Sequence, residues 1–363
     1  MPLFYNSDIV GKKLSVVDEL LLLNPHQIPL ISMLGFGEAI AQTNHQWFED
    51  EMFGDETKVN GAKLSTDTSV VVVDVEPFRV GHVVKIGDEL LLVTAVNTGT
   101  KTLTVTRSYG GTTAAAIADQ AKIEVMFVEG QEGNTARAGR VKQRTQIQNY
   151  TQIFDDTVEL SGTATSIAQY GISNLYEYEK QKKLLELSLQ LEKALINGVG
   201  VNNGNIRQMK GIRNFIQTNV TNASSTALTA AMINDAIQAV YDKGGFQTGG
   251  DYKIIVSPKQ KRAISAFDNN KLYIQQAENS RGVNVETFVS DFGKFEIAVN
   301  NNLASDELIL LDANRVTIRP LVDRSFFHKF LGEVGDSTRG ILVGEYTLEF
   351  QQEKAHARIK GLA

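Results

Sequence analysis

One stretch of the sequence constrains the fold more than any other. It runs from Tyr170 to Gly198 and reads YGISNLYEYEKQKKLLELSLQLEKALING. Strong helix formers fill Glu177 to Ile196 without glycine or proline, and Gly198 stands where a helix needs its C-terminal cap. A helix of this length spans roughly 36 Å, which is enough to cross a whole domain. We therefore expect one long helix, over residues 172–197, to organise the fold.

This predicted helix has apolar residues on two opposite sides. At about 100° per residue, its C-terminal half places Leu184, Leu187 and Leu191 on one side. Its N-terminal half places Leu175 and Tyr176 on nearly the opposite side. The pattern predicts packing against two bodies, such as the chain's own core and a neighbouring subunit. The alternative is a helix buried all round inside a large monomer.

The composition is that of a globular protein with more than one lobe. The chain has 363 residues, of which 42% are hydrophobic and 21% charged, and its 6 prolines leave little room for long disorder. It has no cysteine, which excludes disulfides and thiolate metal sites and fits a reducing cytoplasm. A signal-peptide pattern and apolar runs near 18 residues are absent, so we expect neither secretion nor a membrane span. The net charge of -6 argues against a generally DNA-binding surface.

Two distant stretches of opposite charge are typical of facing strands. Gln46–Asp55 is extended and acidic around Trp47, whereas Arg137–Val158 begins with basic residues and continues in alternation. Opposite charges on facing strands stabilise pairing by roughly 0.2 to 1 kcal/mol per pair. We therefore predict that the two stretches are the arms of one long hairpin. Nucleic-acid contact by the basic run is the alternative, disfavoured by the acidic chain and the lack of interleaved aromatic residues. The charged residues concerned are Glu49, Asp50, Glu51, Arg137, Arg140, Lys142 and Arg144.

The segments around the long helix have two further textures. Residues 68–128 contain short β-branched runs punctuated by glycines, which predicts a small all-β barrel or sandwich inserted into the hairpin. After the helix, a cap at Thr229 predicts a helix over 230–243, and Ser257–Pro258 opens another behind the strand Tyr252–Val256. This part is expected to be an α+β lobe with one sheet, completed by strands at 295–299, 307–311 and 316–321. The alternating tail is expected to return to a sheet near the long helix.

Patterns that build active sites are absent from the sequence. The five histidines are scattered, and neither a G-x-S-x-G elbow nor a phosphate-binding P-loop occurs. Gly198, Gly200 and Gly204 follow a helix, whereas a dinucleotide-binding turn must follow a strand. Adjacent carboxylates such as Asp155 and Asp156 point to opposite faces of an extended segment, which favours solvated or ion-paired roles. We expect no enzyme activity, no cofactor and no metal site.

Five stretches follow one another in a recognisable order: QRTQIQNYTQIFDDTVELSGTA (143–164), the long-helix stretch, MKGIRNFI (209–216), DYKIIVSPKQKRAISAF (251–267) and GEYTLEFQQEKAHARIKGL (344–362). Their order resembles that of the major capsid (major head) proteins of tailed bacteriophages. Their α+β fold, the Hong Kong 97-type, here would carry a β insertion in its extended loop. The resemblance implies an N-terminal arm at 1–45, an extended loop at 46–165 with the inserted β domain at 68–128, a peripheral domain at 166–212 and 330–363, and an axial domain at 213–329.

The resemblance also implies a structural, self-assembling function. The chain would form the icosahedral or prolate head, as hexamers and pentamers, around double-stranded DNA that it encloses without sequence-specific binding. Scaffolding, portal and decoration proteins are implied partners, and a membrane is not. The head would assemble in the host bacterial cytoplasm and become part of the virion. Since a long scaffold segment does not precede residue 45, a separate scaffolding protein or a processed chain is implied. The candidate subunit-interface residues are Trp47, the seven charged residues named above, Leu184, Leu187 and Leu191.

Other classes of function stay open at this point. An encapsulin-like shell would use the same fold to enclose a cargo enzyme instead of a genome. A virion protein that binds a receptor or glycan would use the insertion at 68–128 as its binding module. An enzyme is a third alternative, disfavoured by the empty motif search. Covalent crosslinking between subunits is also open, although Lys58, Asn60 and Lys63 near the hairpin tip form no motif for it.

Overall fold

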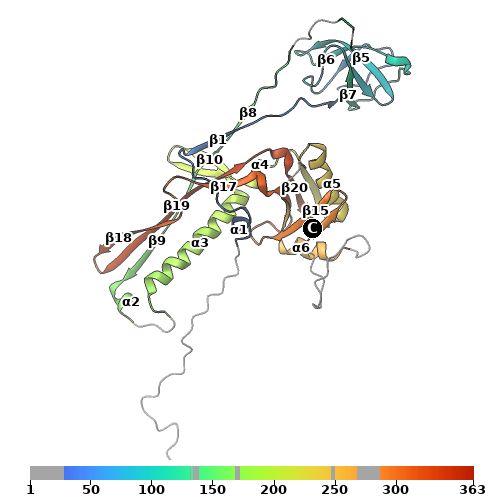
Figure 1. Cartoon of the computed structure of the whole chain (residues 1–363). Coiled ribbons are helices and arrows are strands. Elements are labelled where there is room, and N and C mark those ends of the chain that lie inside the picture. The colour runs from blue at the N-terminus through green and yellow to red at the C-terminus, as the bar shows by residue number, and fades with distance from the viewer. Residues whose placement is uncertain (1–27, 131, 134–138, 168–171, 247–249, 268–286) are drawn as a thin grey trace, which may run out of the picture. The chain divides into compact units, whose positions relative to one another are not determined.

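The computed structural model describes residues 28–130, 132–133, 139–167, 172–246, 250–267 and 287–363 (Figure 1). These residues divide into two compact units. The first contains the described residues up to Trp47 and from Ile147 onward, and the second is Phe48–Gln146. Within the described ranges, no helix is both long and apolar enough to cross a bilayer.

Helix α3, Leu175–Asn197, is the long helix of the first unit. It begins at Leu175 and not at the predicted residue 172, because Asn174 takes the N-cap position. The Asn174 side-chain oxygen accepts a hydrogen bond from the backbone N–H of Glu177 at 3.2 Å. At the other end, a Cβ on Gly198 would collide with the carbonyl oxygen of Met209. Only glycine therefore allows the chain to turn so closely past the end of the helix.

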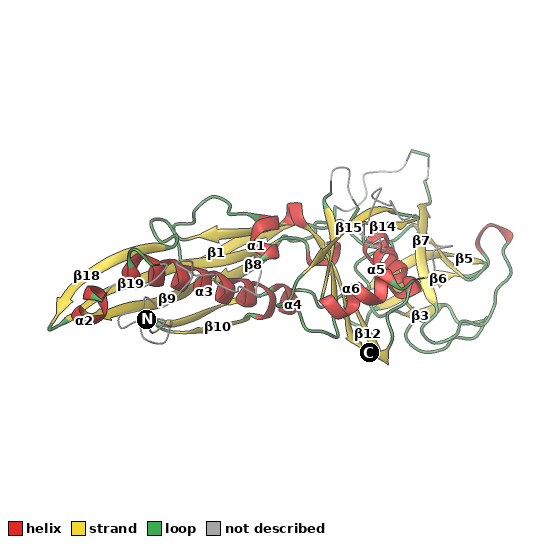
Figure 2. Cartoon of the chain, turned by 90° about the horizontal axis from the view of Figure 1, so that it is seen from below, coloured by secondary structure: helices red, strands yellow, loops and turns green. Residues whose placement is uncertain are grey.

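The sheet beside α3 is built around the long strand β19, Ser337–Phe350. Strands β9 (Gln152–Ser161) and β18 (Phe327–Val334) flank it on its two sides, and β17 (Val316–Pro320) pairs with its last residues, all antiparallel. Helix α3 lies along β9 and β19 (Figure 1, Figure 2). The core between helix and sheet contains Leu187, Leu191, Leu195, Val158, Leu342 and Leu348.

The prediction that Arg137–Val158 forms one arm of the hairpin is wrong for the second half of this stretch. Strand β8, Thr145–Tyr150, pairs with β1, Asn44–Glu49, as expected for a hairpin. The continuation β9 pairs instead with β19, for example Val158 with Gly340. The reason is burial, since Phe154 and Val158 alternate into the core beneath α3.

A six-stranded sheet forms the second core of this unit. Helices α5 (Ala230–Asp242) and α6 (Pro258–Ser265) pack on it, and both begin at their predicted caps. The hydroxyl oxygens of Thr229 and Ser257 accept hydrogen bonds from the backbone N–H groups of Met232 and Gln260, three residues further on, at 3.3 and 3.4 Å. The strand order is β12 (Val220–Thr226), β20 (Ala357–Leu362), β16 (Leu308–Asp312), β13 (Tyr252–Val256), β15 (Gly293–Val299) and β14 (Thr287–Ser290).

Two strands lie in a different sheet from the one expected. Strand β17, expected in the α+β lobe, pairs with β19 in the other sheet. Strand β20, grouped with the tail at 330–363, pairs with β16 and β12. The chain changes sheets at the 3-10 turn η4, Glu353–Ala355. Directly after it, the buried ring of His356 accepts a hydrogen bond at Nδ1 from the backbone N–H of Asp312 at 3.1 Å and fixes the crossing.

The second unit is a small β-barrel. Its six strands are antiparallel neighbours, and the sheet closes where Val59 bridges Val72 between the two edge strands. The barrel begins with β2, Glu56–Lys58, which lies before the predicted boundary at residue 68. The prediction missed this strand because the short sequence Glu-Thr-Lys carries no strand signal. The order is β2 (Glu56–Lys58), β7 (Lys122–Val128), β4 (His82–Ile86), β5 (Glu89–Asn97), β6 (Thr102–Thr106) and β3 (Ser69–Val71).

Short elements complete the first unit. Helix α1, Pro29–Leu34, precedes β1, and α2, Gly162–Ser166, follows β9. The hairpin of β10, Val199–Asn203, and β11, Ile206–Lys210, connects α3 to α4, Ile212–Phe215.

Candidate subunit interface

Three of the apolar interface candidates lie inside the chain's own core. Leu187 and Leu191 are fully buried on α3. Trp47 on β1 is 7% exposed and packs against Phe215, with 6.1 Å between ring centroids. All three belong to one cluster, so their burial is explained without a neighbouring subunit.

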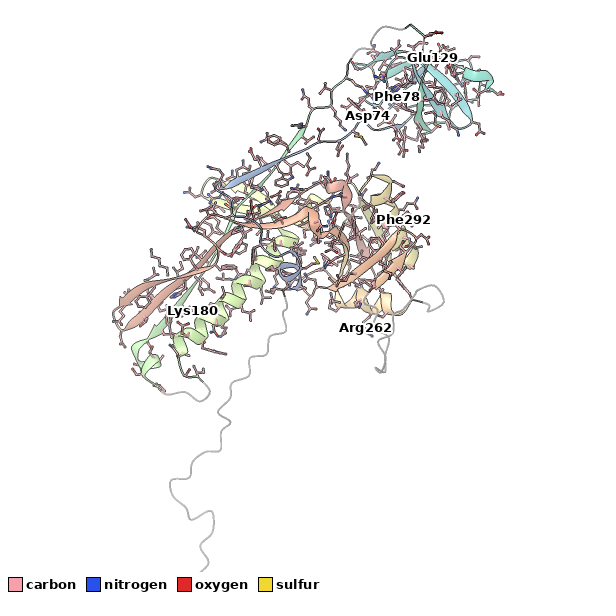
Figure 3. The ribbon with its side chains drawn as sticks, in the orientation of Figure 1. Asp74, Phe78, Glu129, Lys180, Arg262 and Phe292 are labelled. Atoms are coloured by element: carbon pink, nitrogen blue, oxygen red, sulfur yellow. The ribbon has the colours of Figure 1, made fainter. Side chains whose placement is uncertain are left out.

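The second apolar side of α3 also packs within the chain. The Tyr176 hydroxyl lies 2.9 Å from His328 Nε2, and its ring meets the edge of Phe330, both on β18. The outer side of this half of the helix carries ion pairs, such as Lys180 with Glu177 (Figure 3). Leu184 differs from its neighbours because 39% of it is exposed. Of the three leucine candidates on α3, Leu184 is the one available to another molecule.

The charged candidates on the hairpin arms meet in pairs, as the sequence predicts. The Arg144 side chain lies 3.4 Å from Asp50, and the Lys142 ammonium lies 3.3 Å from Glu51. The Arg140 guanidinium donates to the carbonyl oxygen of Pro77 at 2.8 Å. These contacts are mostly solvent-exposed, so each pair contributes roughly 1 kcal/mol at most and is free to exchange partners. Glu49 is partly exposed on β1, and Arg137 lies outside the described residues.

The first unit contains a buried charge network that the sequence analysis missed. Glu345 on β19 is 2% exposed, yet its carboxylate lies 2.8 Å from Arg324 and 3.0 Å from Arg207. The Thr151 hydroxyl donates to the same carboxylate at 2.6 Å. Arg207 comes from β11 and Arg324 from the loop after β17, so one carboxylate ties three segments together. The signal in the sequence is the polar set Glu345, Thr347 and Glu349 on one face of an otherwise apolar strand.

Glu349 repeats this arrangement four residues along the same strand. Its carboxylate lies 2.9 Å from the His45 ring and also contacts the Arg319 guanidinium. The hydrogen bond from His45, together with those from Arg319 and Gln351, lowers the pKa of Glu349 to about 2. The buried polar face of β19 therefore joins β1, β11 and β17 through charged hydrogen bonds.

A third buried carboxylate, Glu192 on α3, is held by neutral hydrogen-bond donors. Glu192 accepts hydrogen bonds from the backbone N–H groups of Leu30 and Ile31, at 2.8 and 3.0 Å, and from Asn300 Nδ2 at 2.7 Å. It connects the start of α1, the long helix and the loop after β15. Burial raises the pKa of the Glu192 carboxyl above its ordinary value of 4.5.

A Glu192→Gln variant is expected to show the pH dependence of this buried group. The native carboxyl keeps its proton at a higher pH than the unfolded one, so its contribution to stability is complete below pH 4.5 and falls as pH rises through the raised pKa. The free energy of unfolding of the wild type, minus that of the variant, should therefore decrease from pH 4 to 8 in urea titrations.

A matched control for this variant is Glu159→Gln. The side-chain hydrogen bond from Arg339 lowers the pKa of Glu159. The free energy of unfolding of the wild type, minus that of Glu159→Gln, should therefore increase as the pH rises. If the free energy of unfolding of the wild type, minus that of Glu192→Gln, instead rose with pH, the fold would stabilise the charged carboxylate. This account of Glu192 would then be wrong.

The arrangement as a whole is suited to holding a framework together. Within the described residues, groups of three or more histidine and carboxylate side chains with metal-binding geometry do not occur. The buried carboxylates are occupied by arginines, backbone amides or asparagine. Each of them ties strands or helices that lie far apart in the sequence.

Comparison with known proteins identifies the family. A family model described as "SU10 major capsid protein" matches residues 4–363. No curated protein matches the sequence significantly. A chain of the cyanophage A-1(L) capsid asymmetric unit is 11% identical, with 98% of each chain covered and a TM-score of 0.58. A chain from the capsid of an empty GTA particle is 9% identical, covering 98% of this chain and 96% of that one, with a TM-score of 0.54. A chain of Gordonia phage Cozz is 10% identical, covering 98% of this chain and 92% of that one, with a TM-score of 0.50.

At such low identities the solved structures show a shared fold, which is the α+β, Hong Kong 97-like fold of phage capsids. The family match adds the sequence relationship, because it covers nearly the whole chain. The chain belongs to the SU10 major capsid protein family and is a structural capsid protein.

Proposed function

We propose that this protein self-assembles, as hexamers and pentamers, into the icosahedral or prolate head of a tailed phage. The observation that carries the proposal is the family match over residues 4–363. The fold supports it, since the solved chains that cover 98% of this one include a capsid asymmetric unit. The head encloses double-stranded DNA and takes its place in the virion after assembly in the bacterial cytoplasm.

The charge of the chain suits a shell that must release its contents. Strong nucleic-acid binding requires clusters of cations, and the net charge here is -6. Several arginines of the first unit are also engaged with buried carboxylates, including Arg207, Arg324 and Arg319. The DNA is thus enclosed without sequence-specific binding, and the role of the protein is structural and not enzymatic.

The subunit contacts of the shell use exposed groups of the candidate set. Leu184 offers an apolar contact on α3, and the pairs Asp50–Arg144 and Glu51–Lys142 can exchange partners with a neighbouring chain. The predicted domains keep their roles, but three strands change domain. Strands β9 and β17 join the peripheral domain with α3, β18 and β19, and β20 joins the axial domain with the six-stranded sheet. The extended loop is then Phe48–Gln146, with its inserted barrel. Scaffolding, portal and decoration proteins are its further partners.

The content of purified particles tests this function. The chain is co-expressed with its neighbouring phage genes, and particles are isolated, treated with nuclease and opened. Protected double-stranded DNA supports a phage head. A single co-purifying enzyme without DNA would indicate an encapsulin-like shell instead. Binding of a glycan by the isolated barrel, in a protein that forms no particles, would favour a receptor-binding virion protein.

A further inference from the structure

We propose that the outward face of the β10–β11 hairpin is a contact surface for a second copy of this chain. The inference rests on the proposed shell function and names one of the surfaces through which the shell is built. Strands β10 and β11 form a two-stranded sheet of their own. Val199 pairs with Lys210, Val201 with Gln208, and Asn203 with Ile206, so these six residues share one face.

The opposite face of the hairpin is anchored to the body of the first unit. Met209 is fully buried in the core, and its backbone N–H donates to the side-chain oxygen of Gln152 at 3.2 Å. Arg207 forms the 3.0 Å ion pair with buried Glu345. Strand β11 also packs on α3, β9 and β19. The hairpin is therefore a fixed part of the surface and presents its outward face in one orientation.

The outward face carries three exposed aliphatic side chains. The exposed fractions of Val199, Val201 and Ile206 are 60%, 41% and 63%. Three β-branched aliphatic residues on one small sheet leave more apolar surface in water than isolated exposed residues do, and such patches mark interaction sites. Figure 2 shows β10 at the border of the unit. Strand β10, Val-Gly-Val-Asn-Asn, also lacks the lysine, proline or other charge that usually protects an edge strand from pairing.

Charge identifies the occupant as another copy of the chain. The face carries no carboxylate, and the ammonium of its lysine, Lys210, lies 4.6 Å from the centroid of the Phe215 ring. Nucleic acid would need several cations here, so it is not the partner. Two copies of a chain with net charge -6 repel each other over most of their surfaces, and a face that has three exposed aliphatic residues and no carboxylate is where they approach at least cost. During assembly of a shell, the capsid protein itself is at the highest local concentration, which also favours a second copy as the partner.

The first test replaces the apolar face without changing the strands. The triple variant Val199→Thr, Val201→Thr and Ile206→Thr keeps β-branching, so strand propensity is retained while the apolar surface is lost. We expect an unchanged circular dichroism spectrum and melting temperature, together with a concentration threshold for assembly raised at least about tenfold. The matched control is Val322→Thr, because Val322 is 46% exposed in the same unit outside the hairpin. Normal assembly of the folded triple variant would overturn the inference.

The second test identifies the neighbour directly. The chain has no cysteine, so Ile206→Cys introduces a single attachment point for a benzophenone maleimide. Irradiation of assembled particles should give a covalent product of twice the 39.9 kDa chain mass, and irradiation of unassembled subunits should not. Adducts with DNA or with a different protein, or monomer alone, would overturn the inference. If the wild type formed no particles at all, the proposed function itself would fail, whereas wild-type particles without this crosslink would contradict the hairpin contact alone.

Discussion

A Leu187→Asp variant is expected to fail to fold. Leu187 is fully buried on α3, in the core shared with Val158 and Leu342. Removing a buried leucine costs about 2 to 5 kcal/mol, and a carboxylate without a partner adds its desolvation penalty. The total is comparable with the whole stability of a typical domain, which is about 5 to 15 kcal/mol. We expect insoluble expression, or a soluble product without cooperative thermal unfolding.

The matched control lies on the same helix, one turn earlier. Leu184 is 39% exposed, so Leu184→Asp should give a folded chain with a melting temperature close to that of the wild type. If Leu184 is a subunit contact, this variant should also assemble less well. A Leu187→Asp chain that melted like the wild type would show that the packing of α3 described here is incorrect.

A Glu345→Gln variant is expected to be the next most damaging. Glutamine keeps the shape and still accepts the hydrogen bond from Thr151, but it leaves the charges of Arg207 and Arg324 without their counter-ion. Breaking a buried ion pair on one side costs about 3 kcal/mol. Since Arg207 anchors the hairpin, amide hydrogens of β11 should also exchange faster with solvent.

The exposed pair of Glu159 and Arg339 provides the comparison for Glu345. Their side chains are 44% and 43% exposed, so Glu159→Gln should lower the urea midpoint far less than Glu345→Gln does. Equal shifts for the two variants would mean that burial of Glu345 does not strengthen its contacts. Both midpoints are measured at pH 7 in the same buffer.

The local elements of this fold are readable from the sequence because their signals lie within a few residues. The long helix ends where predicted, at Gly198, and its start is displaced only by the cap at Asn174. The caps at Thr229 and Ser257 each open the predicted helix. In each case the deciding contact is a hydrogen bond between residues three positions apart.

Strand partners could not be read in this way, because alternation shows that a strand has two faces and not which strand lies beside it. Strand β9 and its partner β19 lie nearly two hundred residues apart in the chain, with Tyr346 opposite Gln152. The change of sheet before β20 depends on His356, whose ring bonds to the backbone of Asp312. Neither contact leaves a local pattern.

A subunit interface cannot be read from apolar periodicity, for a related reason. Apolar periodicity marks residues that are buried, but it does not distinguish burial in the chain's own core, as for Leu187, from burial against a neighbour. The exposed residues Val199, Val201 and Ile206 carry no local signal, because they sit in a glycine-rich stretch without a long apolar run. Their importance depends on Met209 and Arg207 facing the other way, which only the folded structure shows.

The most direct test of the central claim is sedimentation of the purified protein followed by negative-stain electron microscopy. A chain of this family that builds a shell should give closed particles, hexameric or pentameric capsomers, or open sheets. If it stays a compact monomer or dimer at high concentration, the measurement is repeated after co-expression with the neighbouring phage genes, which supplies a missing scaffold. A monomer or dimer in both preparations would contradict the account.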